Sequence, residues 1–181
     1  MRVITGTARG RKLKTLSGDD VRPTSDMVKE AVFSIIQFSI EGRKFLDLFA
    51  GSGQMAIEAL SRGAASAVLV DASKQAGNVI RDNLKTTGFS QVAQLVQSDA
   101  VTYISGCREK FDIAYIDPPY GTNLIERVLP AAADHMNKGG TILCESDSTD
   151  KFPESANDFV LRKTYRYGRI FIGLYRHKDM D

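Results

Sequence analysis

Four residues that follow an apolar run have the composition of a binding site for a flat ring with an amino group. Residues 111–116 are mostly apolar, with β-branched and aromatic members, which predicts a buried parallel strand. Asp117 then supplies a carboxylate, and Tyr120 supplies an aromatic ring. Between them, Pro118 and Pro119 stiffen the turn, because each proline fixes φ at about −65°. The alternative is a simple Asp-Pro turn, which leaves the second proline and the tyrosine unexplained.

The chemistry that suits this turn is modification of an exocyclic amine. Such a nitrogen is a poor nucleophile because its lone pair is delocalised into the ring. The side chain of Asp117 and the main-chain carbonyl of Pro118 can accept its hydrogens and free the lone pair for an in-line methyl donor, so that catalysis is mostly positioning. Stacking of an unstacked base on Tyr120 would add ~1–3 kcal/mol.

A glycine-containing turn at the first expected strand–helix junction predicts a cofactor site. Gly51, Gly53 and Ala56 form the pattern G-x-G-x-x-A, which permits a tight turn and close helix packing. This pattern alone fits NAD, FAD or S-adenosylmethionine. The carboxylate of Asp47 would repel a pyrophosphate, whereas it would attract the ammonium and sulfonium of S-adenosylmethionine. The sequence therefore favours S-adenosylmethionine as the cofactor.

Two further carboxylates follow the next expected strands. Asp71 is suited to the two ribose hydroxyls of the cofactor, and Asp99 to the adenine amino group. Either can instead cap the helix that follows it. Asp47, Asp71, Asp99 and Asp117 at successive strand ends would line one edge of a sheet. Adjacent residues complete the expected cofactor set: Phe49, Ser52 and Ala100.

The elements that must position these residues alternate between strand and helix from residue 44 onward. Strands are expected at 45–49, 67–70, 92–96, around 113 and at 141–144, with helices near 55–60, 74–86, 101–105 and 124–136, the last capped by Thr122 or Asn123. Two β-rich runs, 159–167 and 170–175, predict a final hairpin. The expected fold is α/β and Rossmann-like, with seven mostly parallel strands, an antiparallel C-terminal hairpin and helices on both faces.

Residues 1–43 are expected to form an N-terminal extension that packs on the main domain of residues 44–181. Short strands at 3–5 and 13–16 would flank a small basic loop. A helix would then begin after Thr24 or Ser25, run to about Ser39 and end at Gly42. This extension is the expected RNA-binding part of the chain.

The charge pattern is consistent with a polyanionic partner. The 181 residues carry a net charge of +2, yet residues 1–43 hold eight Lys or Arg against five Asp or Glu, and residues 162–181 hold six against two. Two solvated basic ends would give the same counts. The sequence shows no apolar run of membrane-spanning length and no signal peptide. Cys107 and Cys144 read as reduced thiols with no metal site. We expect a cytoplasmic monomer.

The motifs together resemble the RsmD family of class I, S-adenosylmethionine-dependent methyltransferases. The resemblance spans essentially the whole chain and rests on residues 2–6, 9–13, 22–26, 47–53, 58–64, 71, 99, 117–120 and 167–168. It implies methylation of the N2 amine of one guanine in bacterial 16S ribosomal RNA, with the 30S subunit as partner. It also implies phosphate contacts by Arg9, Arg11, Lys12 and Arg22. Arg166 and Arg169 would be secondary contacts.

Two departures and several alternatives accompany this interpretation. Gln54-Met55 stands where the family usually has smaller residues, and Asp71 where it usually has Glu. The alternatives are a DNA adenine-N6 methyltransferase, a protein-glutamine methyltransferase, an NAD-dependent dehydrogenase and a non-catalytic RNA-binding protein. The sequence does not specify the target nucleotide, or whether free RNA or the assembled subunit is the substrate.

Overall fold

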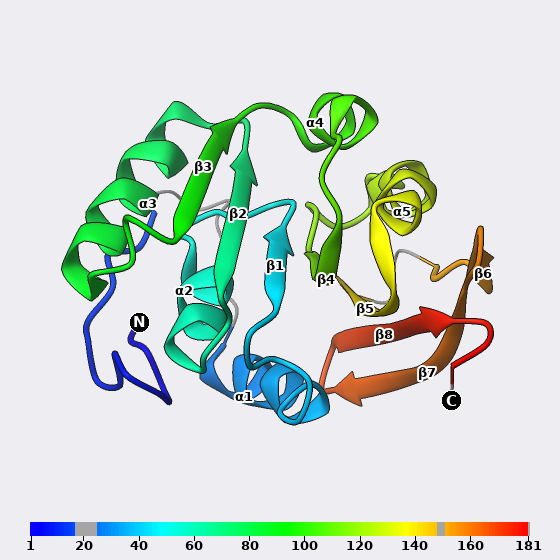
Figure 1. The fold of residues 1–181 in the computed structure, drawn as a ribbon, viewed down its shortest axis with the longest axis horizontal. Coiled ribbons are helices and arrows are strands. Elements are labelled where there is room, and N and C mark those ends of the chain that lie inside the picture. Colours follow the sequence, from blue (N-terminus) through cyan, green and yellow to red (C-terminus); the bar gives the residue numbers. More distant parts are fainter. Residues whose placement is uncertain (17–24, 148–150, 181) are drawn as a thin grey trace.

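The described part of the chain forms one mixed β-sheet with helices on both faces (Figure 1). The structure is a computed structural model and describes residues 1–16, 25–147 and 151–180. The strand order is β3-β2-β1-β4-β5-β8-β7-β6. The strands are β1 Lys44–Asp47, β2 Ser66–Asp71, β3 Ala93–Gln97, β4 Phe111–Ile116, β5 Met136–Ser146, β6 Ser155–Ala156, β7 Phe159–Tyr167 and β8 Ile170–His177.

The first five strands are parallel, and the chain finishes with antiparallel strands. β1 lies between β2 and β4, and β5 pairs with β4 in the same direction. β8 pairs antiparallel with β5 and with β7. The predicted hairpin is therefore confirmed, and β6 adds a two-residue strand at the sheet edge that periodicity did not predict.

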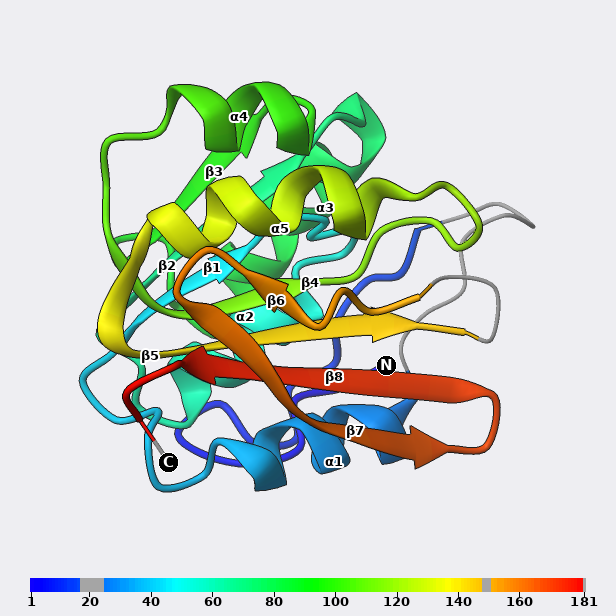
Figure 2. The same cartoon turned by 90° about the vertical axis from the view of Figure 1, so that its right-hand side faces the viewer.

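The helices divide between the two faces of the sheet (Figure 2). One apolar core joins α1 Asp26–Ile35, α2 Gln54–Ser61 and α3 Lys74–Thr87 to one face. A second core joins α4 Ala100–Gly106 and α5 Leu124–Asp134 to the other. No helix among the described residues is long and apolar enough to cross a membrane.

Several predicted boundaries in the N-terminal extension were wrong. α1 begins after Ser25, whose side chain accepts from the Val28 amide as expected, but it ends at Ile35, and Gly42 lies in a later turn. The predicted strands 3–5 and 13–16 are not present as strands: one antiparallel bridge joins Arg2 to Lys12. The reason is that the Ile4 and Thr5 amides donate to a helix side chain instead of to a strand.

The predicted helix caps gave mixed results. Asn123 occupies the N-cap position of α5 with a φ of 55°, but its side chain makes no capping hydrogen bond. The Thr122 hydroxyl instead donates to the Pro119 carbonyl over 2.6 Å. Thr24 lies outside the described residues.

Candidate active site

A cavity of about 680 Å³ lies at the carboxyl ends of β1, β2 and β4. Its wall includes most of the residues predicted to act in catalysis or cofactor binding. These are Asp47, Phe49, Gly51, Ser52, Asp71, Asp99, Ala100, Asp117, Pro118, Pro119 and Tyr120. The sheet order explains this meeting, because strand ends that are distant in sequence reach one edge of a parallel sheet.

Gly53 is the predicted cofactor residue that is not on the cavity wall. It occupies the N-cap of α2 with a φ of 79°, a left-handed conformation that L side chains rarely adopt. A Cβ added there would lie 3.0 Å from the Leu69 side chain and 3.3 Å from that of Ile80. In this structure Gly53 therefore serves to turn the chain and to let α2 pack closely on the core.

Asp47 is a buried carboxylate whose oxygens are poorly satisfied. It is 1% exposed, and neither oxygen makes a hydrogen bond of normal geometry with the described residues. Burial, and secondarily the nearby charge of Asp71, raises the pKa of this carboxyl to about 7, against a smaller lowering by the Ala56 and Phe49 amides. An unpaired buried carboxylate is costly to the fold. Its place on the cavity wall makes it complementary to a positively charged ligand group.

Asp71 and Asp99 both hold backbone groups at the cavity rim. Asp71 accepts from the Gly51 and Ser73 amides at 2.8 Å each, which fixes the glycine turn against the end of β2. The helix cap itself is Ser73, so the capping alternative for Asp71 was wrong. Asp99 does cap α4 by accepting from the Thr102 amide over 2.9 Å. Hydrogen bonding with the Thr102 side chain, and then with its amide, lowers the pKa of the Asp99 carboxyl. Both still line the cavity.

The Asp117–Tyr120 turn is anchored by a carboxylate that the sequence reading missed. Glu145, near the end of β5, is 2% exposed and accepts from the Tyr120 hydroxyl over 2.9 Å. Its other oxygen accepts from the Tyr115 hydroxyl. Burial, then the charges of Glu145 and Asp47, raises the pKa of Asp117 well above its usual range. A lone Glu after the apolar residues 142–144 was the available signal.

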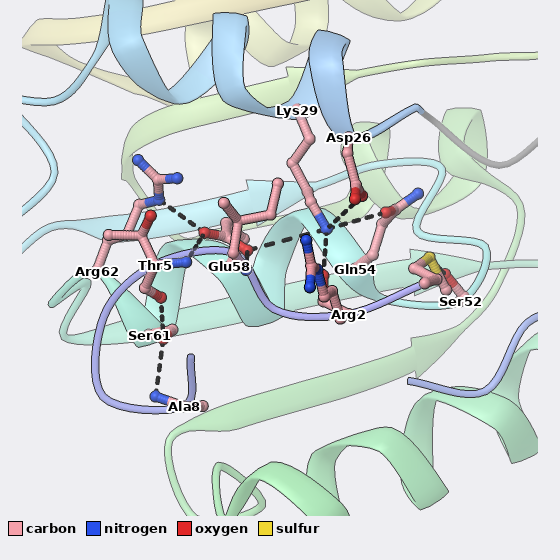
Figure 3. Close-up of polar contacts among 12 residues, drawn as sticks. Arg2, Thr5, Ala8, Asp26, Lys29, Ser52, Gln54, Glu58, Ser61 and Arg62 are labelled. Atoms are coloured by element: carbon pink, nitrogen blue, oxygen red, sulfur yellow. Dashed lines mark hydrogen bonds and ion pairs between the residues drawn. The ribbon is translucent and has the colours of Figure 1, made fainter. Parts of the chain in front are cut away.

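The N-terminal segment completes the cavity wall with Met1, Thr15 and Leu16. It is held by buried polar side chains of the helices (Figure 3). Glu58 of α2 accepts from the Ile4 and Thr5 amides at 2.8 and 2.9 Å. Such polar residues are expected to face solvent in a helical pattern, so the sequence assigned Glu58 no role beyond its place in the motif of residues 58–64.

The predicted RNA contacts that the structure describes lie outside the cavity, on two separate parts of the chain. Arg9, Arg11 and Lys12 are exposed on the loop of the N-terminal segment. Arg169 is exposed at the turn between β7 and β8, and the exposed Arg166 of β7 lies over the Phe171 ring of β8. Arg22 lies outside the described residues. These cations sit on the surface, as phosphate contacts must.

Comparisons with known proteins give the family and the fold. The family model described as "Conserved hypothetical protein 95" matches residues 1–176. Ribosomal RNA small subunit methyltransferase D of Haemophilus influenzae is 30% identical over 98% of this chain and 94% of its own length. The solved structure of Escherichia coli yhhF is 31% identical, covers 98% of this chain and 97% of its own, and superposes with a TM-score of 0.87.

A more distant solved chain, SMU.776 complexed with SAH, has a TM-score of 0.69 at 14% identity, over 82% of this chain and 48% of its own. This likeness concerns the fold alone. The chain belongs to the conserved hypothetical protein 95 family, as the resemblance to RsmD indicated, and has the α/β fold of the class I, S-adenosylmethionine-dependent methyltransferases.

Proposed function

We propose that this member of the family transfers a methyl group from S-adenosylmethionine to the N2 amine of a guanine in the RNA of the small ribosomal subunit. The observation that carries the proposal is the turn from Asp117 to Tyr120, which shares one cavity wall with the unpaired carboxylate of Asp47. The name of the Haemophilus relative supports ribosomal RNA as the substrate class.

The cavity fits the proposed cofactor. Asp47 offers two buried oxygens that make no hydrogen bond of normal geometry with the described residues, and they suit the cationic methionine end of the cofactor and oppose a pyrophosphate. Asp71 stands at the rim for the ribose hydroxyls, and Asp99 with Ala100 for the adenine. The cofactor would supply an electrophilic methyl group on its sulfonium, and the remaining chemistry falls to residues of this chain.

Those residues would act on the amine by orientation. The Asp117 side chain and the Pro118 carbonyl would accept hydrogen bonds from the two N–H groups of the amine, so that the nitrogen lone pair turns toward the cofactor. As the bond from nitrogen to the methyl group formed, the bond from the sulfonium to that methyl would break and release S-adenosylhomocysteine, and the surplus amine proton would pass to the Asp117 carboxylate or to water. Tyr120 lies half-buried beside them, and its hydroxyl bond to Glu145 fixes the ring against which the base would stack. Burial and the charge of Glu145 raise the pKa of Asp117 and so oppose its ionised form. The positive charge of a bound sulfonium would act in the opposite direction and favour the carboxylate.

RNA binding is proposed for the exposed cations of the N-terminal loop. Arg9, Arg11 and Lys12 are free of the cavity and exposed, and each would neutralise a backbone phosphate. Arg22 and Arg169 belong to the same proposal, with Arg169 on the β7–β8 turn. Such contacts read shape more than sequence, which favours a base presented by the assembled 30S subunit over free RNA.

The test is methyl transfer with product identification. Purified protein would be incubated with labelled S-adenosylmethionine and, separately, with unmodified 30S subunits, naked 16S RNA, duplex DNA and ribosomal proteins. We expect N2-methylguanosine after digestion of the RNA or 30S samples and its loss in Asp117→Ala. Label found only as N6-methyladenine in DNA, or only in protein, would contradict the proposed substrate.

A further inference from the structure

We infer that the N-terminal segment, residues 1–16, is a structural wall of the cofactor cavity and that Asn83 is the positioning residue that couples it to the glycine turn. Cofactor binding and docking of this segment are then coupled, so that each one favours the other. The identity of the cofactor in this inference rests on the proposed function. The coupling itself rests on the contacts described below.

The segment reaches the cavity at both of its ends. Met1 comes from one end, and Thr15 and Leu16 from the other. The Leu16 side chain lies 3.9 Å from the position that a Cβ on Gly51 would take, so it packs directly against the glycine turn. The Met1 sulfur is 3.7 Å from the Ser52 hydroxyl of the same turn. A ligand in the cavity therefore meets both the turn and the segment.

Asn83 of α3 joins the segment to the glycine turn through one buried side chain. It is 1% exposed. Its Oδ1 accepts from the Lys14 amide over 2.7 Å, and its Nδ2 donates to the Lys14 carbonyl over 3.0 Å. The same Nδ2 donates to the Ser52 carbonyl over 2.9 Å. One amide group thus fixes the distance between the turn and the residues beside Thr15 and Leu16.

A second anchor, drawn in Figure 3, holds the other end of the segment. Lys29 of α1 is 0% exposed and donates to the Arg2 carbonyl over 2.7 Å. It also lies 3.4 Å from the Gln54 side-chain oxygen, and Gln54 is on the cavity wall. A Glu58 carboxylate oxygen lies 3.9 Å from the Lys29 ammonium, and the same carboxylate accepts hydrogen bonds from the Ile4 and Thr5 amides.

The exposed cations lie between these two anchors. Arg9, Arg11 and Lys12 follow the Glu58 anchor and precede the Asn83 anchor. The loop that presents them to phosphates therefore shares its backbone with the cavity wall. By linkage, a cofactor that favours the docked segment must itself bind more tightly when that segment is held in place by RNA.

The test measures S-adenosylhomocysteine binding by calorimetry, without RNA and without turnover. We expect Asn83→Ala to weaken affinity about tenfold, the effect of losing roughly one net hydrogen bond's worth of positioning. The matched control is Asp82→Ala. Asp82 precedes Asn83 on α3, and its side chain forms an exposed ion pair with Lys14, which is all that this change removes. We expect that control to stay within about twofold of the unmodified chain.

Hydrogen exchange gives a readout that a merely structural role would not change. Binding of S-adenosylhomocysteine should slow exchange at the Ile4, Thr5 and Lys14 amides. In Asn83→Ala this slowing should be lost while amides of the central strands stay protected. Should that variant fail to fold, the same two measurements are made on Gly6→Ala. A Cβ at residue 6 would lie 1.7 Å from the Ser61 carbonyl oxygen, so this change would push the segment away from α2 at the end opposite Asn83.

The outcomes separate this inference from the proposed function. If the unmodified chain does not bind S-adenosylhomocysteine, both fall. If it binds, and the folded variants bind equally well with no change in segment exchange on binding, only the inference falls. If it binds, and affinity and segment exchange change together in Asn83→Ala or Gly6→Ala but not in Asp82→Ala, the coupling holds.

Discussion

The two walls of the cavity handle their buried polar groups in opposite ways. At the strand-end wall, the buried Asp47 makes no hydrogen bond of normal geometry with the described residues, and the partly exposed Asp117 has Glu145 and Asp47 nearby, so desolvation and like charges raise the pKa of each. At the N-terminal wall, the buried Glu58 and Asn83 are bonded to backbone groups of the segment they hold. The strand-end wall, the first wall, therefore carries carboxylates that destabilise the fold and that a ligand can satisfy. In the N-terminal wall, the second wall, buried polar side chains hold the segment in place by hydrogen bonds.

The largest effect is expected from a substitution that disrupts the anchor of the second wall. Glu58→Gln should lower the free energy of unfolding by about 3–5 kcal/mol, because it leaves the buried Lys29 ammonium without its close buried counter-charge. Urea denaturation measures this loss. Glu30→Gln, which changes an exposed carboxylate on α1, serves as the control and should stay within about 0.5 kcal/mol. Equal stabilities would mean that Glu58 does not hold the segment.

The next effect separates activity from stability at the first wall. Asp117→Asn should lower kcat by about 10²–10³-fold, the usual loss when one positioning group of a reaction is removed. It should not destabilise the fold, because an amide in this site avoids the charge that burial and Glu145 oppose. Methyl-transfer assays and thermal unfolding on the same preparation test both parts. A large drop in Tm would make Asp117 a structural residue instead.

A third prediction concerns pH and Asp47. Because its pKa is raised to about 7 in the folded chain, stability from this group is highest at low pH and falls as pH rises from about 4 to about 7. Asp47→Asn should therefore stabilise the chain at pH 8 by up to about 4 kcal/mol, the equivalent of roughly three pKa units, and the gain should vanish below about pH 4. Denaturation at both pH values measures it. A destabilised variant at pH 8 would contradict the account.

The smallest expected effect lies at the Tyr120 anchor. Glu145→Gln keeps one acceptor oxygen but not two, so one of the Tyr115 and Tyr120 hydroxyl bonds is weakened. We expect about 1 kcal/mol, seen as a severalfold rise in the KM for the nucleic acid with kcat nearly unchanged. Tyr120→Phe should give a similar change. An unchanged KM in both would remove Glu145 from the site.

The first wall is the part that could be predicted from sequence. Apolar runs that end in Asp47, Asp71, Asp99 and Asp117 identify strand ends, and parallel pairing brings such ends together. Gly53 was placed at the right turn, although it packs under the cavity instead of lining it. The hairpin at the C-terminus also follows from β-rich runs around a glycine.

The second wall could not be predicted because its signals are long-range. Glu58 contacts residues more than fifty positions away, and Asn83 contacts Lys14 across 69 positions. Hydrophobic periodicity assigns the polar residues of a helix to its solvent-facing side, so it cannot identify polar residues that are buried. The same contacts explain the failed strand prediction, since amides bonded to Glu58 are not available to a ladder.

Direct titration shows whether the cavity binds S-adenosylhomocysteine or a dinucleotide. S-adenosylhomocysteine and NAD⁺ would each be titrated into the unmodified chain by calorimetry at pH 8. We expect saturable one-to-one binding of S-adenosylhomocysteine and none of NAD⁺, because the buried carboxylate of Asp47 opposes a pyrophosphate. Binding of NAD⁺ without S-adenosylhomocysteine would contradict it and would point to hydride transfer.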